Sequence, residues 1–406
     1  MNLPVFIARR ITFNSKRTFS KLSVRIAIIG IMLSLAVMIL SLAVVKGFKS
    51  EIREKIRGFS GDIIVMKLVK DASYDNSPFQ INADTLKKIA SLPEIAHIQP
   101  YALKPGTINT HEEIEGVFIK GVDRNYDWDY FKKILVAGKV IDFSDSVKAR
   151  RQIIISKVLA NRLNLKVGDD FLMYFVQESL LKRKFEIVGI YDLGVEEVDK
   201  TYIIGDISVI RRLNKWKTNE VGGYELRVRD FNNLDVATQR VADNMAYNVN
   251  SYSIKEWYPA IFQWLSLLDV NTEVILILMM AVAVINMVSA LLIIILERTN
   301  MIGILKALGS TNWDIQKIFL NNAAYLIGFG LLLGNVVGLG LGAFQLYTHF
   351  FQLDQASYYM SFIPVEFNLI EIIVLNIGTL LVCLLVLIIP SMLVTRISPV
   401  KTITFK

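Results

Sequence analysis

The sequence is poor in the residues from which catalytic and metal sites are usually built. It has one cysteine, Cys383, and three scattered histidines, His97, His111 and His349, among 406 residues. A single cysteine excludes a disulfide within the chain, so a domain outside the membrane must be held by its own core. The sequence also lacks a G-x-x-x-x-G-K-[ST] phosphate loop, an H-E-x-x-H motif and a G-x-S-x-G motif. We therefore expect no catalytic residue, no metal site and no cofactor in this chain.

Formal charge is absent from four long apolar stretches. They are Ile26–Val45, Val274–Leu296, Ile318–Leu353 and Ile372–Thr395, and none contains Asp, Glu, Lys or Arg. A helix rises about 1.5 Å per residue, so about 20 apolar residues cross a hydrocarbon core of about 30 Å. Four such stretches predict four membrane-spanning helices rather than buried helices of a soluble protein. The lack of ionisable groups deep in these spans disfavours a proton relay or a central ion site.

The distribution of basic residues predicts the orientation of these spans. Residues 1–25 carry six basic residues and no acid, whereas the loop 354–371 carries three acids and no base. By the positive-inside rule, both termini and the loop 297–317 are cytoplasmic, and residues 46–273 and 354–371 lie outside. The net charge of +8 therefore reports membrane topology. It does not indicate nucleic-acid binding, which needs a basic face on a soluble domain.

The pattern divides the chain into consecutive segments. Residues 1–25 mix apolar and basic positions, which is typical of an amphipathic helix on the inner membrane face. We expect a first span and stalk at 26–59, a mixed α/β domain at 60–254 and a stalk and second span at 255–296. A cytoplasmic helix at 297–317, a third span at 318–347, an outer loop at 348–371, a fourth span at 372–395 and a tail at 396–406 follow.

Inside the α/β domain, short strand and helix patterns alternate. Strands are predicted at 63–68, 117–122, 152–155, 171–175, 185–191, 201–204 and 224–228, and helices at 84–91, 157–163, 207–213 and 234–245. We expect two lobes, divided near residues 140 and 230. The first stalk is predicted from Phe48, Ile52 and Ile56 at four-residue spacing, and we expect Gly58 and Gly61 to end it.

Small and polar residues mark packing positions in the spans. Gly330, Gly334, Gly338 and Gly342 form a ridge without side chains, which predicts close helix packing in a bundle or at a dimer face. We expect interhelical hydrogen bonds from Asn286, Asn335 and Asn376. Pro390 predicts a kink near the end of the fourth span.

The cytoplasmic loop is short and strongly patterned. Met301, Ile304, Leu305 and Leu308 form an apolar stripe at helical spacing, and Gly309 is placed to end that helix. An exposed apolar stripe on a short helix favours docking into a partner's groove. A helix lying flat on lipid is the alternative.

Two sets of residues resemble a known family. The run from Arg298 to Gly309, R-x-x-M-I-G-I-L-K-A-L-G, with Ile315 and Phe319 after it, resembles the R-x-x-E-I-G-I-x-x-A-x-G segment of FtsX/MacB-type ABC transporter permeases. Phe6-Ile7-Ala8-Arg9-Arg10, the stretch from Gly30 to Phe48, and Trp257, Phe262 and Leu265 are similar to LolC and LolE, the permeases of the lipoprotein-releasing system. The resemblance covers essentially the whole chain.

This resemblance implies a function and a set of partners. The family has an α-helical membrane part of four spans with long stalks and a large MacB-like extracytoplasmic α/β domain. The implied function is a non-enzymatic permease of the bacterial inner membrane that extracts lipoproteins and releases them to the periplasm. The implied partners are a separate ABC ATPase dimer, which binds ATP and Mg, a second permease copy or paralogue, the lipoprotein cargo and a periplasmic lipoprotein chaperone.

The resemblance also implies roles for particular residues. The ATPase-coupling residues would be Arg298, Met301, Ile304, Leu305, Lys306 and Leu308, and the acyl chains of the cargo would lie against Val37, Ser41 and Val44. Met301 stands where the family has an acid, so an ion pair made by that acid is absent. The turn within Phe175–Lys184 is short where LolC-like proteins have a long hairpin that captures a chaperone.

Two other functions fit the same family. One is a MacB-like mechanotransmitting efflux permease, and the other is an FtsX-like regulator of periplasmic hydrolases.

Overall fold

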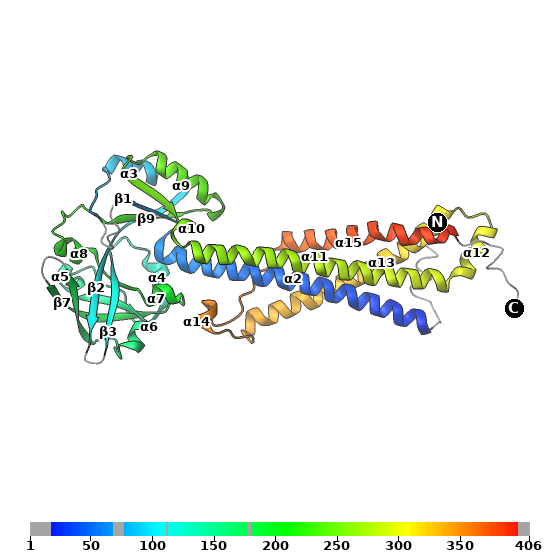
Figure 1. Cartoon of the computed structure of the whole chain (residues 1–406), viewed down its shortest axis with the longest axis horizontal. Helices are drawn as coiled ribbons and strands as arrows, with labels where there is room; N and C mark the ends of the chain where they lie inside the picture. The colour runs from blue at the N-terminus through cyan, green and yellow to red at the C-terminus, as the bar shows by residue number, and fades with distance from the viewer. Residues whose placement is uncertain (1–17, 68–76, 111–112, 177–179, 397–406) are drawn as a thin grey trace. The chain divides into compact units, whose positions relative to one another are not determined.

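The computed structural model describes residues 18–67, 77–110, 113–176 and 180–396. These residues form two compact units (Figure 1). The membrane unit contains residues 18–50, 264–352 and 362–396, and the α/β unit contains residues 51–263 and 353–361. Most of the predicted amphipathic segment 1–25 and nearly all of the tail 396–406 lie outside the described residues.

Four helices among the described residues are long and apolar enough to cross a membrane, as predicted. They are α2 (Thr18–Ser60), α11 (Pro259–Glu297), α13 (Asn312–Thr348) and α15 (Leu369–Ser391). Two short helices, α12 (Thr299–Ala307) and the 3₁₀ helix η2 (Met392–Arg396), belong to the same unit. Pro390 lies in the last turn of α15, where the α-helix ends and η2 begins. Since proline cannot continue the backbone hydrogen bonding, this is a natural place for the helix to end.

The glycine ridge of α13 packs against α2 of the same chain. A Cβ on Gly330 would lie 2.8 Å from Ile31 Cβ, and one on Gly334 would lie 2.9 Å from Leu35 Cβ. A Cβ on Gly338 would meet the backbone of Ala36 at 3.1 Å. At the last position, Gly342, the ring of Phe367 lies 2.5 Å from such a Cβ. The ridge is therefore occupied by packing within the helix bundle of one chain.

Polar side chains add to this packing. Asn335 of α13 and Asn376 of α15 donate to each other's amide oxygens at 2.7 and 3.0 Å. The side chain of Asn286 on α11 packs against Gly30 of α2. In lipid, such an interhelical pair contributes about 0.6–2 kcal/mol, because the alternative is an unpaired amide among hydrocarbon chains.

The α/β unit contains ten described strands. They are β1 (Ile63–Lys67), β2 (Ile95–Asn109), β3 (Ile114–Val122), β4 (Leu135–Gly138), β5 (Gln152–Ser156), β6 (Asp170–Val176), β7 (Leu180–Tyr191), β8 (Tyr202–Asp206), β9 (Gly223–Val228) and β10 (Val249–Ser253). Its helices are α3 (Ala83–Ala90), α4 (Trp128–Ile134), α5 (Ser146–Ala149), α6 (Lys157–Arg162), α7 (Glu196–Asp199), α8 (Ile207–Leu213), η1 (Phe231–Asn233), α9 (Leu234–Asp243), α10 (Ile254–Trp257) and α14 (Gln355–Tyr358). Every strand and helix predicted for this domain is present.

The strands pair in the order β10-β1-β9-β2-β3-β8-β5-β7-β4, and β6 pairs with both β2 and β7. Strand β6 therefore closes β2, β3, β8, β5 and β7 into a ring, and β10, β1 and β9 extend from the first half of β2. The pairs β3–β8 and β5–β7 are parallel. Residue 140, where a lobe boundary was predicted, lies between β4 and β5, and both strands pair with β7. The lobe boundaries near residues 140 and 230 stay a prediction.

The end of α2 differs from the prediction at one glycine. The helix continues through Gly58 to Ser60, and Gly61, at φ +73°, ends it. Only glycine adopts this left-handed conformation without strain. Gly58 lies inside the helix, where a Cβ would come within 2.1 Å of the ring of Tyr130. Gly58 therefore permits close contact, and Gly61 alone terminates the helix.

We expect Gly334→Val to destabilise the helix bundle by about 1–3 kcal/mol, because the new side chain overlaps Leu35. The thermal unfolding midpoint of the full chain in detergent measures this effect. Gly340→Val is the matched control, since a Cβ at Gly340 meets nothing within 4 Å. Equal midpoints for the two variants would contradict the packing described here.

Candidate coupling helix and stalk junction

The predicted cytoplasmic helix is α12, and its end has the geometry of a Schellman motif. Gly309 has φ +90° and donates to Lys306 O at 3.0 Å, and Ser310 donates to Leu305 O at 3.0 Å. These two bonds satisfy carbonyls that the helix leaves unpaired. Thr311 then caps α13 by accepting from the backbone N–H of Asp314.

The apolar stripe expected on α12 is split between two faces. Ile302 is buried, and Met301 and Leu305 pack against the same bundle core. Ile304 and Leu308 point outward, with 53% and 78% of their surfaces exposed. Of the four apolar residues predicted to dock on a partner, only Ile304 and Leu308 are exposed.

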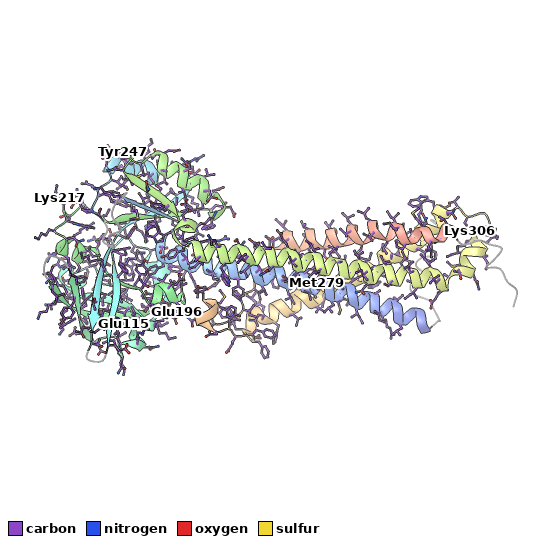
Figure 2. The ribbon with its side chains drawn as sticks, in the orientation of Figure 1. Glu115, Glu196, Lys217, Tyr247, Met279 and Lys306 are labelled. Atoms are coloured by element: carbon purple, nitrogen blue, oxygen red, sulfur yellow. The ribbon has the colours of Figure 1, made fainter. Side chains whose placement is uncertain are left out.

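Lys306 of α12, labelled in Figure 2, makes hydrogen bonds within the chain. Its Nζ donates to the carbonyls of Val394 at 2.8 Å and Thr395 at 3.3 Å, in η2. A cation beside the last carbonyls of a helix is favourable because it complements the helix dipole. Lys306 thus fastens α12 to the end of the fourth span. Arg298 is the residue that precedes α12, at its N-cap position.

Sequence reasoning missed one exposed aromatic residue beside α12. Trp313, in the first turn of α13, is 53% exposed, and Lys317 Nζ lies 5.5 Å from the centroid of its ring. An exposed tryptophan next to an exposed apolar pair is typical of a binding surface. The sequence could have indicated Trp313, because it lies two residues after Thr311, the N-cap of α13.

The residues expected to face acyl chains lie together on α2. Val37, Ser41 and Val44 are half-buried. Their spacing places them on the face that carries Gly30, which contacts Asn286 of α11. The glycine ridge of α13 covers a different face, at Ile31 and Leu35.

Beyond these positions, α2 is held by residues 364–371, which lead into and begin α15. Lys46 forms an ion pair with Glu371 at 2.7 Å, and Ala43 O accepts from Glu366 N at 2.9 Å. A Cβ on Gly47 would come within 2.7 Å of the Pro364 backbone. The backbone contacts fix this segment on the helix, whereas the partly exposed ion pair contributes little by itself.

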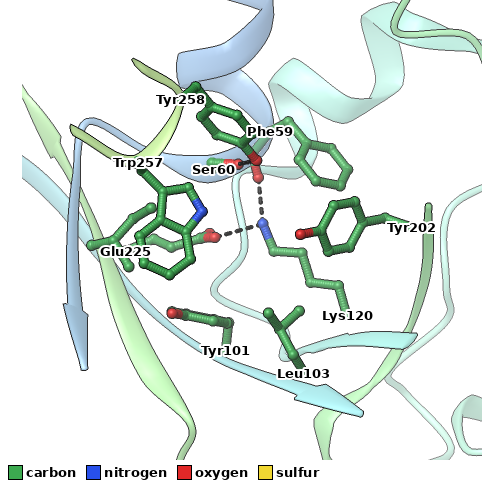
Figure 3. Close-up of a pocket in the computed structure, with 10 residues that line it drawn as sticks. Phe59, Ser60, Tyr101, Leu103, Lys120, Tyr202, Glu225, Trp257 and Tyr258 are labelled. Carbon is green, nitrogen blue, oxygen red and sulfur yellow. Dashed lines mark hydrogen bonds and ion pairs between the residues drawn. The ribbon is translucent and has the colours of Figure 1, made fainter. Parts of the chain in front are cut away.

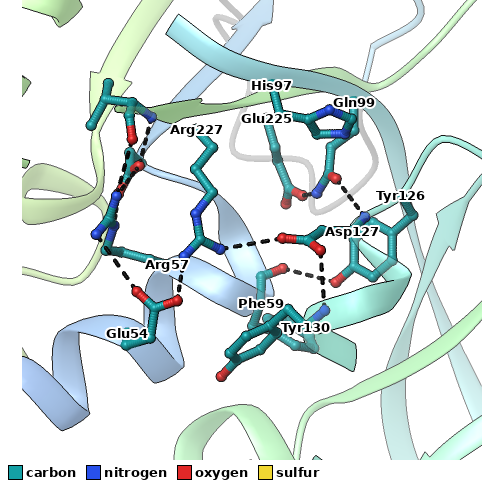
Figure 4. Close-up of polar contacts among 12 residues, drawn as sticks. Glu54, Arg57, Phe59, His97, Gln99, Tyr126, Asp127, Tyr130, Glu225 and Arg227 are labelled. Carbon is teal, nitrogen blue, oxygen red and sulfur yellow. Dashed lines mark hydrogen bonds and ion pairs between the residues drawn. The ribbon is translucent and has the colours of Figure 1, made fainter. Parts of the chain in front are cut away.

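In the α/β unit, the last two turns of α2 enter a network of charged residues (Figure 4). Arg57 pairs with the buried Asp62, and Arg227 pairs with both Glu54 and Asp127. Asp62 also accepts from the backbone N–H of Val228 on β9 at 2.8 Å. Burial raises the pKa of the Asp62 carboxyl, and Arg57 opposes that shift. The network joins the helix to strand β9 and to Asp127, which caps α4.

A buried cation reaches the end of α2 from the sheet (Figure 3). Lys120 of β3 pairs with Glu225 of β9 at 2.6 Å and donates to Phe59 O in the last turn of the helix. Lys120 and Glu225 are 2% and 4% exposed. Burial lowers the pKa of Lys120, and Glu225 opposes that shift. The pair borders a cavity of about 20 Å³, which has room for about one water molecule.

The segment 353–361 also lies in the α/β unit. Gln355 donates to Asp192 at 2.9 Å, and Lys55 donates to Tyr359 O at 2.7 Å. Beside them, Asp199 accepts from the backbone N–H groups of Leu193 and Gly194. Burial raises the pKa of Asp199 to about 6, and these hydrogen bonds oppose the shift.

Among the described residues, no group of three His, Cys, Asp or Glu side chains could hold a metal ion.

Two family models match this chain. The MacB-like periplasmic core domain matches residues 26–244, which is more than half of the chain, and the FtsX-like permease C-terminal domain matches residues 273–399. The chain belongs to the FtsX/MacB-type ABC transporter permeases. Such permeases are membrane subunits and are not themselves enzymes.

Relatives of this permease carry the name of the lipoprotein-releasing system. The permease is 22% identical over 428 residues to the transmembrane protein LolE of Haemophilus influenzae. It is 23% identical over 430 residues to LolC of Neisseria meningitidis serogroup B. Both alignments cover 100% of each chain.

Two solved structures are similar to parts of this chain. The periplasmic region of MacB from Actinobacillus actinomycetemcomitans is 13% identical with a TM-score of 0.36, over 52% of this chain and 97% of that one. The extracellular domain of YknZ is 15% identical with a TM-score of 0.33, over 47% of this chain and 99% of that one.

We expect the permease to lose stability as the pH rises from about 4 to about 6, because folded Asp199 holds its proton up to about pH 6. The unfolded chain releases that proton near pH 4, so deprotonation penalises the folded state, by on the order of 2 kcal/mol. Asp199→Asn should flatten the difference in unfolding midpoint between pH 5 and pH 7.5. Asp170→Asn, at an exposed carboxylate, should leave the wild-type difference unchanged. A wild-type slope in Asp199→Asn would contradict this assignment.

Proposed function

We propose that this permease is the transmembrane subunit of an ATP-driven transporter that extracts lipoproteins from the bacterial inner membrane and releases them to the periplasm. The observation that carries the proposal is the alignment with LolE and LolC over the full length of the chain. The membrane unit and the α/β unit are both included in those alignments, so the proposal rests on the whole architecture.

The physical task requires an external source of work. Moving an acyl chain out of a membrane costs about 0.8 kcal/mol per CH₂ group, so a cargo with several chains is not released spontaneously at a useful rate. The sequence has no phosphate-binding loop. We propose that ATP and Mg bind to a separate ABC ATPase dimer, which docks from the cytoplasm.

The docking surface consists of Ile304 and Leu308 on α12, extended by Trp313 on α13. These three side chains are more than half exposed. Lys306 connects α12 to η2 at the end of α15, so a push on α12 also reaches the fourth span. The positive-inside rule predicts that both termini and α12 are cytoplasmic, on the side where the ATPase would dock.

Cargo would be held on the outer side of the membrane. We assign the acyl-chain surface to Val37, Ser41 and Val44, which share a half-buried face of α2. A second permease copy or a paralogue would complete this surface and pair with the other half of the ATPase dimer.

A periplasmic lipoprotein chaperone would receive the released cargo. Strands β6 and β7 pair up to Val176 and Leu180, so the hairpin that joins them is short. We therefore do not assign chaperone capture to this hairpin.

A MacB-like efflux permease is the second candidate, because the periplasmic core model that matches residues 26–244 is the MacB-like one. An FtsX-like regulator of hydrolases is the third. Both share the ATPase docking surface and differ from the main proposal in what the α/β unit binds.

Purification from native membranes in mild detergent, followed by mass spectrometry, separates these candidates. We expect an ABC ATPase and triacylated lipoproteins to stay bound, and the lipoproteins to leave when ATP and Mg are added. An ATPase together with a periplasmic adaptor or a hydrolase, and no lipidated cargo, would contradict lipoprotein release.

We expect the double variant Ile304→Asp with Leu308→Asp to lower the amount of co-purified ATPase at least about tenfold. Two carboxylates would replace the exposed apolar centre of the docking surface, and such central contacts often exceed 1.4 kcal/mol. Val236→Asp is the control, because Val236 is 53% exposed on α9 of the α/β unit. If the double variant retains the ATPase at the control's level, α12 is not the docking element.

A further inference from the structure

A fully buried ion pair lies where the α/β unit meets the end of α2. Lys120 and Glu225 belong to β3 and β9, and neither faces solvent. Lys120 Nζ lies 4.5 Å from the ring centroid of Phe59 and 5.3 Å from that of Tyr126. An aromatic box of this kind stabilises a desolvated cation at one defined position.

Stability alone does not account for this pair. Removing two charges from water costs several kcal/mol per ion, and apolar residues of similar volume often give an equally stable or more stable core. A buried charge whose partners are fixed, however, specifies one geometry, because any other arrangement leaves a charge unpaired.

This pair fixes the position of the C-terminal end of α2. Phe59 O lies in the last turn of α2, among the carbonyls that have no partner within the helix. It accepts from Lys120 Nζ and from Tyr126 OH, the latter at 3.2 Å. Tyr130 OH donates to Lys55 O at 3.2 Å, one turn earlier.

The acid partner is itself held in place. Gln99 of β2 donates to Glu225 at 2.8 Å and accepts from the backbone N–H of Asp127 at 3.0 Å. Ser60 and Tyr258 share a hydrogen bond of 3.0 Å, which links the end of α2 to the segment that enters α11. Side chains from β2, β3, β9 and α4 therefore converge on one helix terminus.

We propose that Lys120 is a positioning residue that fixes the rotation and register of α2 in the α/β unit, so that displacement of the helix is passed to this unit. Lys120 acts through the Phe59 carbonyl and does not contact cargo. That Lys120 fixes the end of α2 rests on the geometry alone. That displacement of α2 is passed to the α/β unit rests also on the proposed function.

The test uses the full-length permease with its ATPase in nanodiscs. The variant combines Lys120→Met with Glu225→Gln, because Lys120→Met alone leaves a buried carboxylate unpaired and can prevent folding. Hydrogen exchange at residues 56–60 measures the grip. We expect exchange there to rise by about tenfold, the factor that corresponds to loss of one charge-assisted hydrogen bond, while β5 and β7 keep wild-type protection.

A second readout measures transmission as lipoprotein released per ATP hydrolysed. We expect this ratio to fall several-fold in the double variant. Two controls should keep the wild-type ratio. Lys184→Met with Asp170→Asn removes an exposed ion pair between β6 and β7. Ile153→Val destabilises the core at a fully buried position without touching α2.

The outcomes separate the two proposals. Unchanged exchange at residues 56–60 overturns the grip, and faster exchange with an unchanged release ratio overturns the positioning role. If the wild-type complex hydrolyses ATP and releases no lipoprotein, the proposed function fails, and the exchange result still decides whether Lys120 grips the helix.

Discussion

The structure depends on how one long helix ends. Helix α2 runs from Thr18 to Ser60, and the boundary between the two units falls within it. Its last carbonyls need partners, and in a helix end that enters a domain those partners must come from the domain itself. Lys120 and Tyr126 supply them at Phe59 O, and Tyr130 donates to Lys55 O one turn earlier. The cost of burying Lys120 is offset by Glu225 and the surrounding rings, and Gly58 lets Tyr130 approach closely enough to take part.

The same helix organises the membrane unit. One face of α2 accepts the glycine ridge of α13, so the two backbones approach closely. Farther along, Ala43 and Gly47 hold the segment before α15, at Pro364 and Glu366, through backbone contacts. The face with Val37 and Ser41 remains half-buried. We propose that this helix, packed along one face and held at its end, carries displacement, and that the half-buried face with Val37 and Ser41 contacts cargo.

Long apolar runs made the spans predictable, and alternating strand and helix patterns made the α/β class predictable. The contacts of buried polar groups could not be predicted. Strand β2 was missed because Pro100, Pro105 and Lys104 interrupt the strand pattern, although all lie in a 15-residue strand. Nothing in the sequence shows that Lys120 and Glu225 meet. On α12 the helical spacing of apolar residues predicted an apolar stripe. It could not show that Met301 and Leu305 pack against the helix bundle, or that Lys306 donates a hydrogen bond to Val394 O. A helical pattern identifies a face and leaves its neighbour unknown.

We propose that ATP binding to the ATPase docked on α12 moves the stalk part of α2. The most direct measurement places one spin label on the exposed Ser50, in a chain with Cys383→Ala, and another at the matching stalk position of the second permease subunit. Pulsed electron paramagnetic resonance in nanodiscs then compares the nucleotide-free complex with the ATP-trapped complex. The account predicts a shorter distance between the two labels when ATP is trapped. The same distance in both states, in a complex that hydrolyses ATP and releases lipoprotein, would contradict it.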